Sequence, residues 1–348
     1  MTSKTESAID LIVKTSEKYA LPWEVGFSGG KDSTVTLSLI IEALEGGAKI
    51  PELYVIYTDT LLEHPVLRRE ALGALDSLTV LGDERIVPVR LVPGDGEDFI
   101  SMVVEKGYPM PSYRFRWCMK RLKLGPTGKF LRRLGSHVEA SGVRLAESHE
   151  RARNIGNYAG KMKVFESSGS QRVMIMPISD WSTEDVVNYL RTHRRWDGRS
   201  FDYLLDLYGY GLEDSCAASP PACPADPAAS SSSITVRFGC WVCTVVRREK
   251  MPTSQLLRWA KEELLSISRN PNYREFDGDG RPHRLNAEGR MAAAAVFLRV
   301  LREEPEAFGY NIDELEGKLR KVVDGSYPNL ATSSTGRSNE DFMYLSVS

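Results

Sequence analysis

The stretch Ser28-Gly29-Gly30-Lys31-Asp32-Ser33 decides which fold this chain can form. It follows an apolar run typical of a β-strand, 23–27. It precedes a helical pattern, 33–45, in which apolar residues recur near helical spacing until a Gly-Gly pair ends it. The hexapeptide is therefore predicted to form a strand-to-helix turn. Such a turn directs backbone N–H groups and the positive end of a helix dipole at one point, which favours the binding of a phosphate.

The residue types within this turn suit a phosphate. Gly29 and Gly30 lack a Cβ, so the backbone can come close to phosphate oxygens. Ser28 and Ser33 add hydroxyl donors, and Lys31 adds a positive charge. A plain glycine turn is the alternative interpretation. The segment is not a Walker A loop, because that needs the pattern G-x-x-x-x-G-K-[ST]. It resembles the loop of the PP-loop ATP pyrophosphatases, which cleave ATP between the α and β phosphates.

Strand-like runs and helical patterns alternate through the first half of the chain. The further strands are expected at 53–57, 85–92, 137–143 and 173–178, with helices at 64–78 and 98–106. This alternation predicts an α/β fold in which a mostly parallel, Rossmann-like sheet is flanked by helices. Ligands of such sheets bind beyond the carboxyl ends of the strands. The glycine-rich turn and Asp59, which follows the second strand, are therefore expected to line one cleft.

The chain is expected to divide into three parts. Residues 1–180 form a nucleotide-binding α/β domain, 181–250 contain a helix and a cysteine-bearing loop region, and 251–348 form a helical C-terminal part. Within the second part, 217–233 is rich in Ala, Pro and Ser, a composition that cannot bury a core.

Composition and charge limit the class of protein. The hydrophobic fraction of 42% is ordinary for a globular chain, and the net charge of -2 means that any surface for nucleic acid must be a local patch. No run approaches the roughly 18 apolar residues of a membrane span. The N-terminus lacks the apolar segment of a signal peptide. We therefore expect a soluble, cytoplasmic protein with no membrane partner.

The five cysteines are an odd number, which argues against a disulfide scaffold and favours metal or redox chemistry. Cys240 and Cys243 form a C-x-x-C, and Cys216 and Cys223 lie upstream. Four thiolates suit an iron–sulfur cluster or zinc. A C-x-x-C also fits a redox dithiol, and the two upstream cysteines could be incidental residues of the Ala/Pro/Ser stretch. Cys118 stands apart from the other four.

Several clusters of basic residues are candidates for binding a polyanion. They lie at 114–133, 144–163, 191–199 and 247–250. Tyr113, Phe115 and Trp117 are interleaved with the first cluster. Basic residues with interleaved aromatics suit single-stranded nucleic acid. They suit a triphosphate equally well, and solvated helix faces account for part of the pattern.

Taken together, the motifs resemble the phosphoadenylyl-sulfate reductase superfamily. The resemblance rests on W-C-x-x-x-x-K-x-x-P at 117–126, G-V-R-x-x-E-S-x-x-R at 142–151 and P-I-x-x-W-S-x-x-D-V at 177–186. The segment R-F-G-C-W-V-C-T-V-V at 237–246 is more specific. It resembles the DndC/SspD group, the PP-loop iron–sulfur enzymes of DNA phosphorothioation, and the compact length is nearer to SspD than to the longer DndC.

This resemblance implies a set of site residues. ATP with Mg²⁺ would be bound by Ser28, Gly29, Gly30, Lys31, Asp32, Ser33, Asp59, Arg144 and Arg151, of which Lys31, Asp32 and Arg144 would be catalytic. A [4Fe-4S] cluster would be bound by Cys216, Cys223, Cys240 and Cys243. As the pattern has a cysteine where this chain has Ser233, the fourth ligand is either Cys216 or Cys118.

The resemblance also implies a reaction and partners. A DNA phosphate oxygen would attack the α phosphorus of ATP, pyrophosphate would leave, and sulfur would then displace AMP. The implied partners are DNA, a cysteine desulfurase as sulfur donor, and other proteins of a phosphorothioation system. Three alternatives remain: a sulfonucleotide reductase, whose usual E-C-G-x-H tail has no counterpart after Cys243, a non-catalytic nucleotide-gated scaffold, and a transfer-RNA thiolation enzyme.

Overall fold

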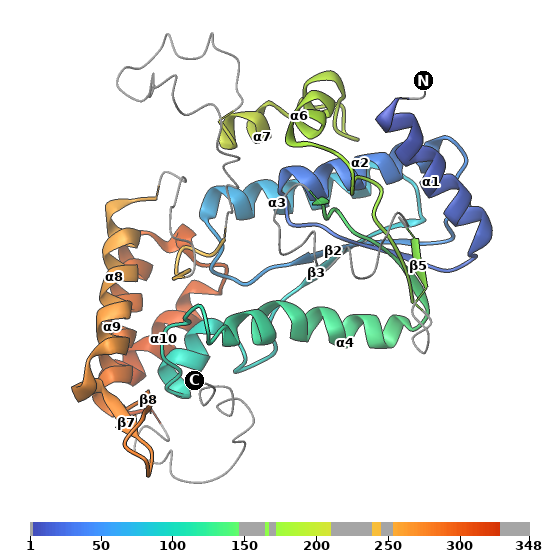
Figure 1. The fold of residues 1–348 in the computed structure, drawn as a ribbon. Helices are drawn as coiled ribbons and strands as arrows, with labels where there is room; N and C mark the ends of the chain where they lie inside the picture. Colours follow the sequence, from blue (N-terminus) through green and yellow to red (C-terminus); the bar gives the residue numbers. More distant parts are fainter. Residues whose placement is uncertain (1–2, 146–163, 167–171, 210–238, 245–252, 328–348) are drawn as a thin grey trace, which may run out of the picture. The chain divides into compact units, whose positions relative to one another are not determined.

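The computed structural model describes residues 3–145, 164–166, 172–209, 239–244 and 253–327 (Figure 1). The chain forms two compact units, and each is assembled from separate stretches of sequence. The first contains 1–57, 70–89 and 133–236, and the second contains 58–69, 90–132 and 237–348. The three-part division expected from the sequence stays a prediction.

A six-stranded sheet is the centre of the first unit. Its strands are β1 (Trp23–Gly26), β2 (Leu53–Thr58), β3 (Ile86–Leu91), β4 (His137–Ala140), β5 (Val164–Glu166) and β6 (Arg172–Ile175). They are ordered β3-β2-β1-β4-β6-β5. Strand β1 is parallel to β2 and β4, β4 is parallel to β6, and β5 is antiparallel to β6. The predicted α/β fold with a mostly parallel sheet is confirmed.

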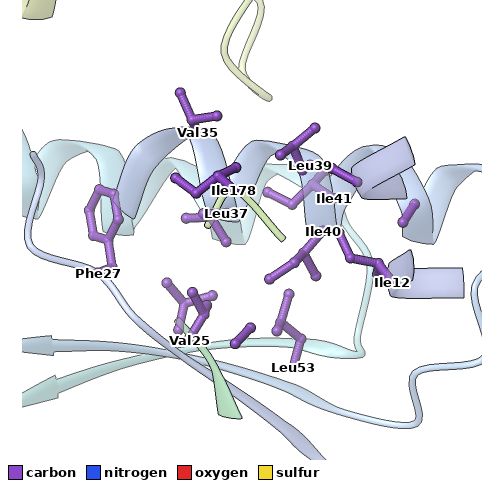
Figure 2. Packing of buried hydrophobic residues seen from close by; sticks show 14 of the residues in the cluster. Ile12, Val25, Phe27, Val35, Leu37, Leu39, Ile40, Ile41, Leu53 and Ile178 are labelled. Atoms are coloured by element: carbon purple, nitrogen blue, oxygen red, sulfur yellow. The ribbon is translucent and has the colours of Figure 1, made fainter. Parts of the chain in front are cut away.

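Helices cover this sheet through apolar side chains. The helices of the first unit are α1 (Lys4–Lys18), α2 (Lys31–Glu45), α6 (Thr183–Thr192) and α7 (Asp202–Leu207). Two others, α3 (Pro65–Ser77) and α4 (Gly125–Leu134), have residues in both units. Figure 2 shows Val25 of β1 and Leu53 of β2 below Leu37 and Ile40 of α2, all of them buried. This core fixes α2, and with it the turn that precedes α2, against the central strands.

The second unit is mainly helical. It contains the π-helical turns η2 (Ser101–Glu105) and η3 (Met119–Leu124), the helices α8 (Gln255–Arg269), α9 (Ala287–Glu303) and α10 (Ile312–Val323), and the hairpin β7 (Arg274–Phe276) and β8 (Pro282–Leu285). Helix α9 packs against both α8 and α10 (Figure 1). None of the helices among the described residues is both long and apolar enough to span a membrane.

An aromatic core holds the C-x-x-C within the second unit. Trp241, which lies between the two cysteines, is fully buried, and its ring meets those of Phe297 and Phe308 at centroid distances of 6.3 Å and 5.8 Å. Its indole N–H donates to the carbonyl oxygen of Ala307 over 3.0 Å. Because a buried indole N–H needs an acceptor, this bond fixes the orientation of Trp241. The position of the cysteine loop is thus set by a packed tryptophan.

Candidate functional site

The glycine-rich turn connects β1 to α2 in the first unit. Gly29 takes the left-handed φ of 70°, and a Cβ there would lie 2.9 Å from the Cβ of Ala71. Gly30 is the N-cap of α2 and has no side chain that could cap the first turn of that helix. The start of α2 directs the positive end of its dipole at the turn, as a phosphate-binding turn requires, and the backbone N–H of Lys31 interacts with the Tyr208 phenol.

Two serine hydroxyls hold the shape of the turn. The Ser28 and Ser33 oxygens are 3.1 Å apart, and the backbone N–H of Ser28 donates to the Ser33 hydroxyl over 3.2 Å. The Ser33 hydroxyl donates in turn to the carbonyl oxygen of Gly30 over 3.0 Å. These bonds close the turn on itself, so the two serines pre-organise the backbone as well as supplying polar atoms.

The three predicted catalytic residues are in contact. Asp32 accepts from the Lys31 ammonium at 2.6 Å through one oxygen and from the Arg144 guanidinium at 2.7 Å through the other. Arg144 is only 2% exposed and also donates to the carbonyl oxygen of Trp181 over 3.3 Å. Two cations that would repel one another are thus held together by one carboxylate, which leaves a net charge of +1 beside the turn.

Gly142 allows Arg144 to reach the start of α2. A Cβ at Gly142 would lie 3.1 Å from the carbonyl oxygen of Asp32 and 3.0 Å from the hydroxyl of Thr36. The close approach brings the G-V-R segment, which follows β4, to the first turn of α2. Close packing against α2 therefore explains why this motif begins with a glycine.

Tyr208 is a member of this site that sequence reasoning missed. The Lys31 ammonium lies 5.0 Å from the centroid of its ring, within the range of a cation–π contact. Burial raises the pKa of the Tyr208 phenol well above its ordinary value, so the phenol stays neutral. Tyr208 follows the short helix α7, far along the chain from the turn, and no local pattern marks it.

Asp59 lies in the second unit and is fully buried. Its carboxylate accepts from the guanidinium groups of Arg68 at 2.9 Å and of Arg90 at 2.8 Å. It also accepts from the backbone N–H of Leu61 at 2.8 Å, and Leu61 takes a left-handed φ of 67°. Asp59 therefore holds two arginines at the carboxyl ends of β2 and β3. Arg68 and Arg90 were not among the predicted site residues.

Cys240 lies in a polar part of the second unit. Its sulfur is 3.1 Å from the hydroxyl oxygen of Thr60, and its backbone forms a β-bridge with Glu63. Burial raises the pKa of the Cys240 thiol to about 12. Lys123 opposes this shift with its positive charge, and its ammonium is 3.2 Å from the carboxylate of Glu63.

Cys118 belongs to the same surroundings. Burial raises the pKa of the Cys118 thiol, and the neighbouring charge of Cys243 raises it further. Burial alone would lower the pKa of Lys123, but Glu63, Cys240 and Cys118 raise it overall. Cys118, Cys240 and Cys243 are all free thiols. The W-C segment and the C-x-x-C, separated by more than a hundred residues, thus interact within one unit.

The donor type suits an iron–sulfur centre, because soft thiolates are its usual ligands. Among the residues that the structure describes, no three His, Cys, Asp or Glu side chains form a metal-binding group. Two of the predicted ligands, Cys216 and Cys223, lie outside the described residues, as does Arg151 of the predicted nucleotide site. The complete ligand set stays a prediction.

The basic clusters differ in how far they are exposed. Arg195 is buried and paired with Asp197, whereas Arg194 is exposed. In the first cluster, Arg121 and Lys129 share the carboxylate of Glu97 at 3.5 Å and 3.1 Å. These contacts neutralise part of the clusters at 114–133 and 191–199, whereas 247–250 and most of 144–163 lie outside the described residues.

A comparison with known protein families shows which family this chain belongs to. Residues 23–245 match the phosphoadenosine phosphosulfate reductase domain family. The matched range contains 223 of the 348 residues, counted from 23 to 245. The chain therefore belongs to the phosphoadenosine phosphosulfate reductase domain family.

The curated relatives are uncharacterised proteins of Methanocaldococcus jannaschii. The chain is 33% identical over 206 residues to the protein MJ0066. This match covers 58% of this chain and 38% of the relative. It is 26% identical over 257 residues to MJ0973. This match covers 72% of this chain and 53% of the relative. The chain thus spans about half the length, or less, of these relatives.

Two solved structures match the chain at low sequence identity. The phosphoadenylyl-sulfate reductase of Candida auris, solved as a phosphate complex, is 15% identical, with 60% of this chain and 93% of that chain covered and a TM-score of 0.35. The U34-tRNA thiolase NcsA of Methanococcus maripaludis, with its [4Fe-4S] cluster, is 13% identical. The match covers 98% of this chain and 86% of that chain, with a TM-score of 0.36.

Proposed function

We propose that this protein is a PP-loop ATP pyrophosphatase of the DndC/SspD type. It activates a DNA backbone phosphate by adenylylation, so that sulfur can replace a non-bridging oxygen. The observation that carries the proposal is the glycine-rich turn at the start of α2, with the Lys31–Asp32–Arg144 group beside it. The R-F-G-C-W-V-C segment at 237–243 supports the DNA-directed type within the family.

The turn supplies electrostatic stabilisation of the leaving pyrophosphate. A diester phosphate is a poor electrophile because its oxygens are bad leaving groups, and adenylylation gives it AMP as a leaving group. As the bond between the α and β phosphates of ATP breaks, negative charge grows on the departing pyrophosphate. The positive end of the α2 dipole and the Lys31 ammonium stabilise this charge without reorganising. Arg144, which is buried and held by Asp32 and Trp181, is a positioning residue that fixes Asp32 and thereby Lys31.

Magnesium enters with the nucleotide in this proposal. Both oxygens of Asp32 are bonded to cations, and so is the carboxylate of Asp59. Mg²⁺ commonly keeps several waters and takes its other ligands from substrate phosphates. ATP is therefore bound as its magnesium complex, with the protein contacting the phosphates and not the ion.

An iron–sulfur cluster is the proposed cofactor of the second unit. Cys240 and Cys243 would hold it with Cys223 and with either Cys216 or Cys118, and the electrostatic interaction between Cys118 and Cys243 favours Cys118. Such a cluster supplies thiolate-bound iron that can interact with sulfur. The sulfur donor in this proposal is a cysteine desulfurase, and the cytoplasm is where the protein and the other phosphorothioation proteins act.

The products of ATP turnover test the proposal. With ATP, Mg²⁺ and single-stranded DNA, we expect AMP and pyrophosphate in equal amounts. Lys31→Ala removes one charge-assisted contact of about 1.5–3 kcal/mol, which corresponds to a loss of roughly 10- to 100-fold in affinity or rate. Lys14→Ala is the control, because that lysine makes only an exposed pair with Asp10. ADP and phosphate as the main products would overturn the proposal, and the absence of turnover would favour a non-catalytic scaffold.

The family match supports a second candidate, a sulfonucleotide reductase. A reductase would use a thiol reductant to reduce phosphoadenylyl sulfate or adenylyl sulfate to sulfite, with no cleavage of ATP. Among these 348 residues, the five cysteines are the thiols that such a reaction could use. Sulfite release from either sulfonucleotide, measured beside AMP formation from ATP, separates the two candidates.

A further inference from the structure

One loop of the second unit exposes an aromatic ring among basic side chains. Tyr113 is 72% exposed, and the Arg116 guanidinium lies 4.7 Å from the centroid of its ring. The Arg116 Nε also donates to the carbonyl oxygen of Tyr113 over 3.3 Å. Arg114, Arg116 and Lys120 are exposed, and within the described part of the chain neither Arg114 nor Arg116 has a carboxylate partner.

The other two aromatics of this segment belong to the core. Trp117 is 5% exposed and donates its indole N–H to the carbonyl oxygen of Pro109 over 2.9 Å. The ring of Phe115 is stacked on that of Tyr108, with centroids 6.4 Å apart and an angle of 9° between the planes. Of the three interleaved aromatics, Tyr113 is the exposed one, whereas Phe115 is half-buried and Trp117 is buried.

The loop that carries Tyr113 is fixed at its base. The backbone N–H of Met110 donates to the Ser268 hydroxyl over 2.9 Å, and the Thr244 hydroxyl donates to the carbonyl oxygen of Pro111. At the tip, Ser112 and Phe115 exchange two hydrogen bonds of 3.1 Å, one from each backbone N–H. Tyr113 therefore stands on a tight turn with a rigid base, so that ordering it for a ligand costs little entropy.

We propose that Tyr113, with Arg114 and Arg116, is a stacking platform for an unpaired base of single-stranded DNA. This inference rests on the proposed function, because it assigns where the DNA strand is held. Every base presents a π-face that an exposed tyrosine can stack on, and unpaired arginines contact the phosphates on either side of the base. The surplus of cations around a single ring favours a polyanion over an apolar protein surface.

The platform lies beside the cysteine loop. Thr244, which anchors Pro111, directly follows Cys243, and Cys118 directly follows Trp117 at the other end of the same loop. A strand held on Tyr113 is therefore placed next to the thiols of the second unit. This placement gives the platform a purpose in sulfur transfer to the backbone phosphate.

Binding of an oligonucleotide to the full-length protein tests the platform. The probes are a labelled 12-nucleotide single strand, the same strand with abasic sites, its RNA counterpart and a duplex, measured by fluorescence anisotropy over a range of salt concentrations. We expect Tyr113→Ala to weaken binding of the normal strand by about 5- to 150-fold, the range for loss of one stacked base. Tyr113→Phe keeps the ring and is expected to bind like the unaltered protein.

Two further measurements separate the contribution of base stacking to binding from that of charge. The abasic strand has no base to stack, so Tyr113→Ala is expected to leave its affinity unchanged. Arg116→Gln is expected to lower the salt slope of single-strand binding by about 0.7 for the lost phosphate contact. Phe276→Ala is the matched control, because Phe276 is 52% exposed in the same unit but stands between Glu275 and Asp277. It is expected to change nothing.

The outcomes distinguish this inference from the proposed function. If the protein binds the normal strand and Tyr113→Ala binds it equally well, the platform is overturned and the proposed function stands. If the Tyr113-dependent loss is found but DNA-dependent AMP formation is not, the proposed function is overturned and the platform stands. Tyr113-dependent binding of RNA without binding of DNA would also overturn the DNA-directed function. No binding of any strand at low salt would overturn both.

Discussion

Two buried or half-buried carboxylates each hold a pair of cations. Asp32 joins Lys31 to Arg144, and Asp59 joins Arg68 to Arg90. Sequence reasoning treated both acids as candidates for Mg²⁺ or nucleotide positioning, and it gave the positive charges separate roles. In the structure each acid concentrates two cations at one point, which is an arrangement suited to a phosphate and not to a metal ion.

Gly29 offers a sharp test of the turn. Gly29→Ala places a Cβ at a φ of 70° and 2.9 Å from the Cβ of Ala71, so it meets both backbone strain and a steric clash. Gly47→Ala is the matched control, because Gly47 has a φ of 93° but open space around it. We expect Gly29→Ala to lower the free energy of unfolding by about 1–3 kcal/mol and to abolish ATP binding.

The control isolates the strain of the backbone. Gly47→Ala is expected to lose stability through its φ alone, by about 1–2 kcal/mol, and to bind ATP normally. Urea unfolding followed by circular dichroism gives the stability, and titration calorimetry with ATP gives the affinity. Normal ATP affinity in Gly29→Ala would show that the turn is not the phosphate site.

Strand β1 carries a buried acid that makes stability depend on pH. Glu24 is 5% exposed, and burial, with a further contribution from Glu139, raises its pKa to about 8. The folded state therefore keeps a proton that the unfolded chain loses above its ordinary pKa of 4.5. The stability from this group is fully present below pH 4.5, falls as the pH rises from 4.5 to 8, and then stays level.

We expect the free energy of unfolding to fall by up to about 1.4 kcal/mol per pH unit in that window. Glu24→Gln keeps a neutral side chain at all pH values, so it is expected to flatten this dependence and to be more stable than the unaltered protein at pH 8. Thermal unfolding between pH 5 and pH 8.5 measures it. Glu45→Gln, at the exposed end of α2, is the control and leaves the slope unchanged. An equal slope in Glu24→Gln would contradict the assignment.

The loop after α6 contains one exposed and one buried arginine, which are expected to have different roles. Arg194 is exposed, whereas Arg195 is buried, paired with Asp197 and close to the ring of Trp196. If this cluster contacts DNA, Arg194→Glu weakens binding of every single-stranded sequence alike and lowers the salt slope by at least about 0.7. ATP binding without DNA is expected to stay normal.

Arg195→Glu is expected to act on stability instead. It places a carboxylate beside Asp197 in a buried position, which costs about 3–5 kcal/mol as for a broken buried pair. Thermal unfolding and anisotropy measured on both single variants separate the two effects. An unchanged salt slope in Arg194→Glu would show that this loop is not part of the DNA surface.

Local sequence patterns predicted helices and strands. They could not predict which residues from distant parts of the sequence lie together in a site. The helix expected at 64–78 is α3 at Pro65–Ser77, because apolar spacing and chain breakers act over a few residues. The edge strand β5, at Val164–Glu166, was not predicted, since a three-residue strand carries almost no periodic signal. Tyr208 and Arg90 reach their sites only through the fold. Cys118 was a candidate for the fourth ligand from the sequence, and the fold brings it into the same surroundings as the C-x-x-C.

At the level of the entire chain, the proposed function assigns activation of a phosphate to the first unit and sulfur chemistry to the thiols of the second unit. In anaerobically purified protein we expect bound iron and absorbance at about 400 nm, since soft thiolates favour iron–sulfur centres. Cys240→Ser and Cys243→Ser are expected to lose the iron, because a hydroxyl is a poor ligand for it. They are also expected to lower thermal stability, as binding of a structural centre contributes to folding.

The fourth ligand is decided by a pair of matched variants. Cys118→Ser and Cys216→Ser each remove one thiol, and the variant that keeps its full iron content identifies the cysteine that is not a ligand. The interaction of Cys118 with Cys243 leads us to expect iron loss in Cys118→Ser and full iron in Cys216→Ser. Iron analysis and visible absorbance provide the readout without any activity assay. Stoichiometric zinc with no iron in the unaltered protein would refute the cluster, because the same four thiolates would then form a closed structural zinc site with no role in sulfur transfer.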